Sequence, residues 1–187
     1  EISGTIDESI RHAVTKFAHI HFPATKKAAQ NIIKMGENVK NVHKVGCPRI
    51  DLIKETLKTK IDLKKFQKKI FMSGVGEKFD MEKENFIVVM QHPVTTEYFK
   101  AGDQVYNTLK ATSKIDLKKI FFWPNVDAGS EQISLTIRKW RESKKDKGFY
   151  FIKNLDTEYF YYLLSLSKCL VGNSSAGIRD AGFLGLP

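Results

Sequence analysis

The sequence has few residues that could cross-link a chain or hold a metal. Among its 187 residues there are only two cysteines, Cys47 and Cys169, which lie far apart, each in an apolar context. They provide neither a disulfide framework nor the paired ligands of a zinc cluster, so we expect a reducing, cytoplasmic location. No uncharged apolar run reaches the roughly 18–20 residues of a membrane helix, and no signal peptide is recognised. We therefore expect no membrane association.

Disorder-promoting composition is also lacking. The chain has five prolines, 42% hydrophobic residues and 28% charged residues, which is an ordinary globular composition. It begins with Glu1 rather than Met, and it ends at Pro187 directly after an apolar run. We therefore expect a folded piece of a longer protein.

The net charge of +10 raises the possibility of a nucleic-acid partner. The lysines are concentrated in residues 54–69 and 139–147, where they alternate with apolar or acidic residues. Such alternation is typical of solvated helix faces rather than of a basic surface for phosphate backbones. Nucleic-acid binding is not expected.

Apolar periodicity predicts strands that alternate with helices of about ten residues. Helices are expected at residues 6–18, 26–35, from 48 into the lysine-rich segment, and at 103–113, 131–142 and 157–165. Strands are expected at 86–90, 118–123, 149–154 and 168–172, short strand-like pieces at 19–25 and 41–48, and a loop at 73–84. This alternation predicts an α/β fold, a Rossmann-like, doubly wound, mostly parallel sheet.

Ligands of such sheets bind beyond the carboxyl ends of the strands. Three predicted strands are followed there by loops rich in small and polar residues: QHPVTT, PNVDAGS and GNSSAG. The chemistry of the protein is expected at these loops.

The GNSSAGIRD segment places Ser174 and Ser175 at the entrance to a predicted helix, where free N–H groups favour a phosphate. The alternative is that Asn173 or Ser174 only caps the helix. Asp180 follows on the same helix, within plausible reach of a ribose.

His92 stands between a predicted buried strand and Pro93, so its imidazole is expected at the strand-end crevice. It could contact phosphate or carry a proton, although a lone histidine is more often structural. Asn125 and Asp127, in the next loop, could equally be ordinary turn residues.

Acidic and basic side chains cluster near the start of the chain. Glu1, Asp7, Glu8, Arg11 and His12 surround a glycine and a helix entrance. Such clusters can transfer protons. Spacings of four residues, from Asp7 to Arg11 and from Glu8 to His12, are explained as simply by surface ion pairs.

Five segments, taken together, resemble the hydrolysing UDP-N-acetylglucosamine 2-epimerases of sialic acid synthesis. They are EISGTIDESIRHAVTK, VGCPRID, QHPVTTE, WPNVDAGS and GNSSAGIRDAGFLGLP, in the family's order and spacing. The resemblance implies a two-domain glycosyltransferase-B type fold with the active site between the domains. Residues 1–46 would then end the first domain, and residues 47–187 would form most of the second, UDP-binding domain.

The resemblance also implies roles for single residues. Loss of UDP gives a glycal, which is hydrated to N-acetylmannosamine, with no metal or other cofactor and with carboxylates moving the protons. The implied catalytic residues are Glu1, Asp7, Glu8 and His92. The implied UDP-binding residues are His92, Asn125, Ser174, Ser175 and Asp180. The family usually has Glu where this chain has Asp180, which is one methylene shorter, so the ribose contact could shift.

Other functions remain open from the sequence. A related epimerase could act on UDP-diacetylbacillosamine in legionaminic acid synthesis, and a glycosyltransferase could bind a UDP-sugar without epimerising it. The isolated chain could also bind UDP without turnover, because it lacks most of one domain. A homo-oligomer is expected for the full-length protein.

Overall fold

The computed structural model describes the backbone of residues 6–187 and the side chains of residues 8–187, Thr95 excepted. Two compact units make up the chain, residues 1–51 and residues 52–187. Helix α3 (Pro48–Lys58) spans the boundary between them.

In its described residues, from 6 to 51, the first unit consists of short helices and one isolated bridge. Its elements are α1 (Ile6–Phe17), α2 (Lys26–Lys34) and the 3-10 helix η1 (Val39–Asn41). Helix α2 begins after Thr25, whose side chain accepts a hydrogen bond from the N–H of Ala28. The strand-like pieces expected at 19–25 and 41–48 form no regular strand but pair through a parallel bridge between His21 and Val42, and the N–H of Val45 donates to the carbonyl oxygen of Pro23.

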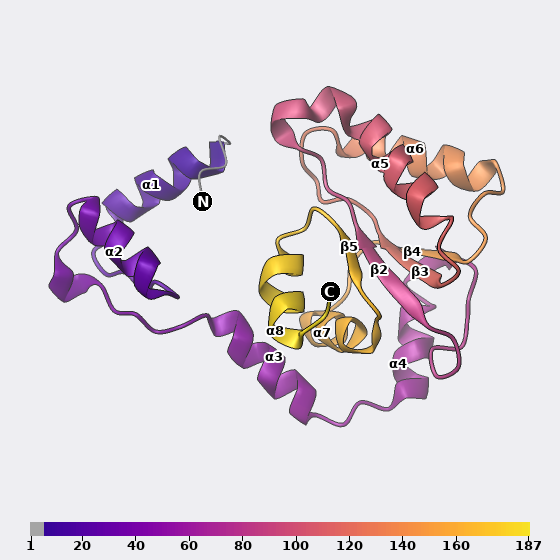
Figure 1. The fold of residues 1–187 in the computed structure, drawn as a ribbon, viewed down its shortest axis with the longest axis horizontal. Helices are drawn as coiled ribbons and strands as arrows, with labels where there is room; N and C mark the ends of the chain where they lie inside the picture. Colours follow the sequence, from indigo (N-terminus) through magenta and orange to yellow (C-terminus); the bar gives the residue numbers. More distant parts are fainter. Residues whose placement is uncertain (1–5) are drawn as a thin grey trace. The chain divides into compact units, whose positions relative to one another are not determined.

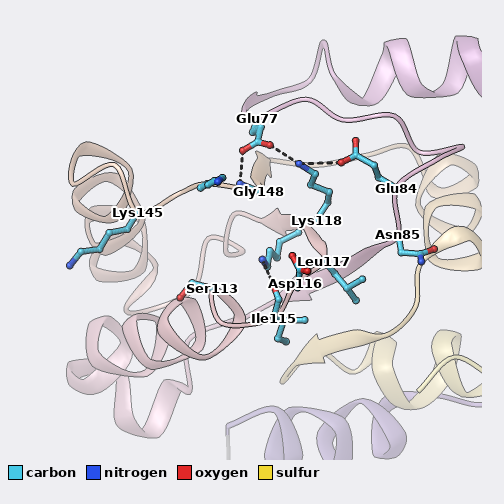
Figure 2. A pocket seen from close by; sticks show the side chains of 12 residues that line it. Glu77, Glu84, Asn85, Ser113, Ile115, Asp116, Leu117, Lys118, Lys145 and Gly148 are labelled. Carbon is cyan, nitrogen blue, oxygen red and sulfur yellow. Dashed lines mark hydrogen bonds and ion pairs between the residues drawn. The ribbon is translucent and has the colours of Figure 1, made fainter.

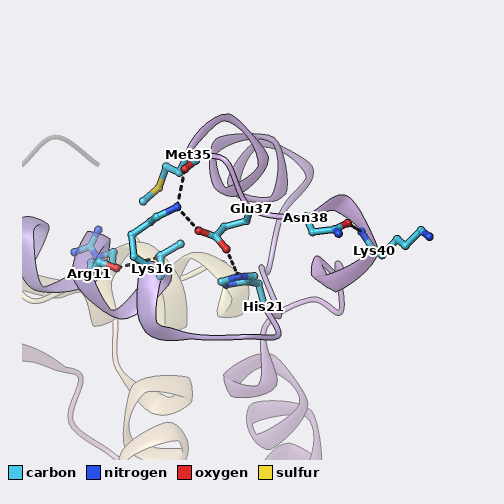
Figure 3. A network of polar contacts seen from close by, with 8 residues as sticks. Arg11, Lys16, His21, Met35, Glu37, Asn38 and Lys40 are labelled. Carbon is cyan, nitrogen blue, oxygen red and sulfur yellow. Dashed lines mark hydrogen bonds and ion pairs between the residues drawn. The ribbon is translucent and has the colours of Figure 1, made fainter.

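A polar network joins the end of α1 to the segment after α2 (Figure 3). Lys16 Nζ donates to Glu37 Oε1 at 2.6 Å and to the carbonyl oxygen of Met35 at 3.0 Å. The buried ring of His21 lies 3.3 Å from Glu37 Oε2 through Nε2. The hydrogen bond from Lys16 lowers the pKa of the Glu37 carboxyl below its ordinary value. This carboxylate therefore links two helical segments.

The second unit is a sheet with helices on both faces (Figure 1). Its strands are β1 (Gly74–Gly76), β2 (Phe86–Met90), β3 (Lys118–Phe122), β4 (Phe149–Ile152) and β5 (Leu170–Gly172). Its helices are α4 (Leu63–Ile70), α5 (Ala101–Thr112), α6 (Ser130–Glu142), α7 (Thr157–Leu166) and α8 (Gly182–Leu184), with a 3-10 helix η2 (Thr95–Lys100) and a π-helix η3 (Gly177–Ala181). No helix of the described residues is long and apolar enough to cross a membrane.

Strand order is β1-β4-β3-β2-β5, and only the β1–β4 pair is antiparallel. The chain runs outward from β2 through β3 to β4 and then returns, so that β5 pairs with the opposite edge of β2. This reversal is the switch point of a doubly wound sheet. The predicted α/β class and the mostly parallel sheet are confirmed.

Two hydrophobic layers follow from the alternation of side chains along β2. Ile87 and Val89 point to the layer covered by α5 and α6, which contribute Val105, Leu109, Ile133, Ile137 and Trp140. Phe86 and Val88 point to the layer covered by α4 and α7, which contribute Phe66, Ile70, Leu163 and Leu164. Because both faces of the strand are buried, its sequence is a continuous apolar run.

The predicted loop at 73–84 is wrong in one part, because residues 74–76 form the edge strand β1. The strand was not predicted because it contains two glycines, and glycine has a low β-strand propensity. They are needed there because a Cβ on Gly74 or Gly76 would collide with a backbone carbonyl oxygen of β4. Close approach of two backbones thus takes the place of side-chain packing.

The amino edge of the sheet holds a cavity of about 560 Å³ with several lysines (Figure 2). Lys118 Nζ lies 2.6 Å from Glu77 Oε1 and 3.2 Å from Glu84 Oε1, and Glu77 Oε2 accepts the N–H of Gly148 at 2.6 Å. The buried Lys119 donates to the carbonyl oxygen of Ile115, just after the end of α5. Lysines suit this edge because helices end there with partial negative charge. The network fixes β1 to the rest of the sheet.

We expect Glu77→Gln to lower the free energy of unfolding by roughly 1 kcal/mol, because it removes a charged partner of Lys118 and of a backbone N–H. Urea unfolding at neutral pH measures this loss. The bond to Lys118 lowers the pKa of Glu77, so its contribution is complete above the ordinary carboxyl pKa and disappears as the pH falls through the lowered value. Wild type and variant should therefore converge in acid.

Glu82→Gln is the matched control, because Glu82 is exposed and its carboxylate makes no ion pair within the described residues. Equal loss in both variants, or a difference that persists in acid, would contradict the assigned role of Glu77.

Candidate functional site

Three strand-end loops of the second unit carry the predicted site residues. His92 follows β2, Asn125 follows β3, and Ser174 and Ser175 follow β5. Strands β2 and β5 are the neighbours at the switch point of the sheet. The loops therefore leave the sheet at the edge where ligands of doubly wound folds bind. The structure brings His92, Asn125 and the serine loop to one edge.

The loops after β2 and β5 are joined by a pair of hydrogen bonds. The backbone N–H of His92 donates to Asn173 Oδ1 at 2.8 Å, and Asn173 Nδ2 donates to the carbonyl oxygen of His92 at 2.9 Å. The N–H of Asn173 donates to the carbonyl oxygen of Met90 at 3.2 Å. The side-chain amide thus continues the pairing of the two strands beyond their ends.

Gly172 makes this close approach possible. Its φ of 141° lies in a region that other residues rarely adopt, and a Cβ there would collide with the carbonyl oxygen of Met90. A glycine is therefore required where β5 passes β2. In the sequence, Gly172 stands directly before Asn173, Ser174 and Ser175. The sequence analysis used this segment only to predict phosphate binding and did not predict the close approach of the two strands.

The imidazole of His92 is half-buried and faces the loop after β3. The N–H of Asn125 points at His92 Nδ1 over a long contact of 3.5 Å. Burial lowers the pKa of His92, and the nearby Asp127 carboxylate opposes this shift. The neutral ring is therefore the main form at neutral pH.

Ser174 and Ser175 stand before the π-helix η3. Ser174 is half-buried, and its Oγ accepts the N–H of Ala176 at 3.3 Å, which is a local turn bond. The N-cap of η3 is Ala176, and no side chain caps this helix. Ser175 is exposed, and its carbonyl oxygen accepts the N–H groups of Ile178 and Arg179. Both hydroxyls lie at the strand-end surface, and phosphate contact stays a prediction.

Asp180 lies on η3 and is only 1% exposed. A ribose would need access to a carboxylate that the surrounding residues cover. Its ribose contact stays a prediction.

A cavity of about 600 Å³ opens beside Asn125. Trp123 and three cationic side chains, Arg138, Arg141 and Lys153, contribute to its lining. These cations raise the electrostatic potential at this edge, which favours an anionic ligand nearby.

The predicted acids belong to the first unit. Glu1 lies outside the described residues, and Asp7 is described only by its backbone in α1. Glu8 is half-buried on the same helix. Their roles in proton transfer stay predictions. Within the described residues, no three His, Cys, Asp or Glu side chains gather as metal ligands would.

Asn173 is the residue whose role sequence reasoning missed. It was considered only as a helix cap, whereas its amide reaches a residue 81 positions earlier in the chain. No local pattern distinguishes these two uses of an asparagine.

Comparisons with known proteins match the whole chain to one family. A family model described as UDP-N-acetylglucosamine 2-epimerase matches residues 1–187. The chain is 35% identical over 187 residues to a UDP-N-acetylglucosamine 2-epimerase of Neisseria meningitidis, and 32% identical over 186 residues to a UDP-N,N'-diacetylbacillosamine 2-epimerase (hydrolyzing) of Legionella pneumophila. All of the chain is covered in both cases, but only 46% of each relative. The chain therefore spans about half the length of these relatives.

Solved structures show the same fold. The crystal structure of a UDP-GlcNAc 2-epimerase from Neisseria meningitidis bound to UDP-GlcNAc matches with a TM-score of 0.72 at 19% identity, over 92% of this chain and 44% of that one. The Methanocaldococcus jannaschii UDP-GlcNAc 2-epimerase, in complex with UDP-GlcNAc and UDP, matches with a TM-score of 0.66 at 14% identity, over 91% of this chain and 44% of that one. The predicted fold class, part of a two-domain glycosyltransferase-B type architecture, is confirmed.

We expect Gly172→Ala to lower the free energy of unfolding by about 2–4 kcal/mol, because the new Cβ forces β5 away from β2 in addition to straining the backbone. Thermal unfolding followed by circular dichroism measures the loss. Gly185→Ala is the control, since Gly185 also has a positive φ but a Cβ there meets nothing within 4 Å. Similar losses in both variants would mean that strain alone, and not the contact with Met90, requires Gly172.

Proposed function

The chain belongs to the UDP-N-acetylglucosamine 2-epimerase family, and we propose that its full-length protein is a hydrolysing epimerase that releases UDP and N-acetylmannosamine. The observation that carries the proposal is the joining of His92 and the serine loop at the switch point, in a chain that the family model matches from end to end. That edge is where a doubly wound sheet binds a nucleotide.

The proposed reaction has two steps. A base takes the proton from C2 of the sugar while the bond from C1 to the UDP oxygen breaks, which gives UDP and a glycal. Water then adds its hydroxyl to C1, and a proton returns to C2 from the opposite face, which gives N-acetylmannosamine. No electrons are gained or lost overall, so the scheme needs no redox cofactor, and carboxylates suffice for the proton transfers.

Residue roles follow from the motifs. We assign nucleotide binding to His92, Asn125, Ser174, Ser175 and Asp180. Half-buried or exposed polar groups at the strand ends support the first four. We assign proton transfer to Glu1, Asp7 and Glu8, with His92 assisting the departure of UDP.

The family also suggests the domain organisation, location and pathway of the full-length protein. Residues 1–46 would complete a first domain and residues 47–187 most of a second, with the sugar between them. We place the full-length protein, as a homo-oligomer, in the cytoplasm and in sialic acid synthesis. The 187-residue chain alone would bind UDP without turnover, because it spans only 46% of its relatives.

A second substrate is supported by one observation. The identity to the diacetylbacillosamine epimerase of Legionella pneumophila, 32%, is close to that of the relative named for N-acetylglucosamine. The sugar itself would be read largely by residues outside this chain.

We expect the 187-residue chain to bind UDP in isothermal titration calorimetry, and the double variant Ser174→Ala, His92→Ala to bind at least about tenfold more weakly. The double variant Ser165→Ala, His19→Ala is the matched control, because both of these residues are exposed and neither lies in a strand-end loop. Unchanged affinity in the site variant would remove these two residues from the nucleotide site.

We expect the full-length protein to convert UDP-N-acetylglucosamine to UDP and free N-acetylmannosamine, with no acceptor sugar present. Proton NMR of the reaction mixture identifies the products. UDP-N-acetylmannosamine as the product would mean a non-hydrolysing epimerase, and UDP release only on addition of an acceptor would mean a glycosyltransferase. Faster turnover of UDP-diacetylbacillosamine would select the second substrate.

A further inference from the structure

The side-chain amide of Asn173 forms hydrogen bonds with both backbone polar groups of His92. Its Oδ1 accepts the N–H of His92 at 2.8 Å, and its Nδ2 donates to the carbonyl oxygen of His92 at 2.9 Å. Met90 and Gly172 are the last paired residues of β2 and β5. The amide therefore substitutes for a further pair of strand residues at a place where the two loops would otherwise separate.

This double contact constrains the backbone around His92. An amide that bonds the N–H and the C=O of the same residue fixes the peptide groups on both sides of it. The direction in which the side chain leaves the backbone is fixed with them. Asn173 itself is anchored, because its own N–H donates to the carbonyl oxygen of Met90 at 3.2 Å.

The orientation of the ring then decides which nitrogen carries the proton. The N–H of Asn125 points at Nδ1 of His92, so Nδ1 presents a lone pair and not a hydrogen. In the neutral ring the proton must then lie on Nε2. Burial lowers the pKa of His92 and so favours this neutral form at neutral pH. The ring is left with one donor, the Nε2–H.

We propose that Asn173 is a positioning residue that holds His92 with Nδ1 toward Asn125 and so presents its Nε2–H to the diphosphate oxygens of the nucleotide. This rests on the proposed nucleotide site, and it adds a specific proton and the residue that places it. A hydrogen bond from Nε2–H to an anionic oxygen is stronger than one between neutral groups. It would stabilise UDP both as part of the substrate and as the leaving group.

A merely structural role is the competing account. If the amide only stabilised the pairing of β2 with β5, its loss would lower thermal stability without changing the tautomer or the titration of His92. The ring of His92 therefore has to be observed directly.

Long-range ¹H–¹⁵N NMR of the histidine rings in the 187-residue chain provides this measurement. The signals of His92 are assigned by their loss in His92→Gln, and the spectra need no nucleotide. We expect wild type to show the Nε2–H tautomer with a pKa below the ordinary histidine value. In Asn173→Ala we expect a mixture of tautomers, a pKa that returns toward the ordinary value, and UDP affinity reduced by about tenfold.

Two further variants make the result decisive. Asn173→Asp keeps an acceptor for the N–H of His92 but loses the donor to its carbonyl oxygen, so we expect a tautomer mixture between those of wild type and Asn173→Ala. Its tautomer decides the matter if Asn173→Ala does not fold, whereas its pKa does not, because the added carboxylate raises the pKa of the ring by itself. Asn38→Ala is the control, because Asn38 also accepts a backbone N–H, that of Lys40, but lies in the first unit. We expect the wild-type ring in this control.

The outcomes separate the two proposals. An unchanged His92 spectrum in Asn173→Ala, with only a lower melting temperature, would overturn the positioning role and leave the nucleotide site standing. Failure of wild type to bind UDP would count against the proposed nucleotide site, while the spectra without nucleotide would still decide whether Asn173 orients the ring. Altered spectra combined with unchanged UDP affinity would overturn the assigned contact between Nε2–H and the diphosphate.

Discussion

The second unit depends on the burial of β2 on both faces. Its five residues supply alternate side chains to two hydrophobic layers, and its two edges pair in parallel with β3 and β5. Parallel strands require crossover connections, so helices must cover both faces of the sheet. Because β2 is an interior strand between β3 and β5, the chain reversal lies beside it. The candidate site lies at that reversal, where the loops after β2 and β5 leave the sheet.

The two edges of the sheet differ in charge and in contacts. At the amino edge, Lys118 is paired with two carboxylates and Lys119 bonds a carbonyl oxygen near the end of α5, so these two cations have partners within the fold. At the carboxyl edge, Arg138, Arg141 and Lys153 line an open cavity beside Asn125, and of these Arg141 lies 3.9 Å from Asp146. The net charge of +10 is therefore not spread evenly over the surface of the protein. What matters for an anionic ligand is which cations the fold has left facing solvent.

The sequence predicted the fold correctly where the residue pattern of a single element determines its structure. The continuous apolar run of β2 predicted a strand buried on both faces, and the alternation of strands and helices predicted the doubly wound sheet. It failed where two distant backbones approach each other, as at β1, whose glycines have no strand propensity but fit closely against β4. Asn173 is a further example, because an asparagine before a helix is read locally as a cap. Its partner lies 81 residues away, and only the register between β5 and β2 reveals it.

The pairing of β5 with β2, rather than with β4, also affects synthesis of the chain. Until residues 170–172 have left the ribosome, one edge of β2 has no strand partner, and its exposed N–H and C=O groups could pair with another chain. The same late segment delivers Gly172 and Asn173, which bring the loop of His92 into place. Closing that edge and assembling the strand-end site are therefore one event. A nascent chain that still presents the open strand to chaperones or to other chains cannot yet have a completed strand-end site.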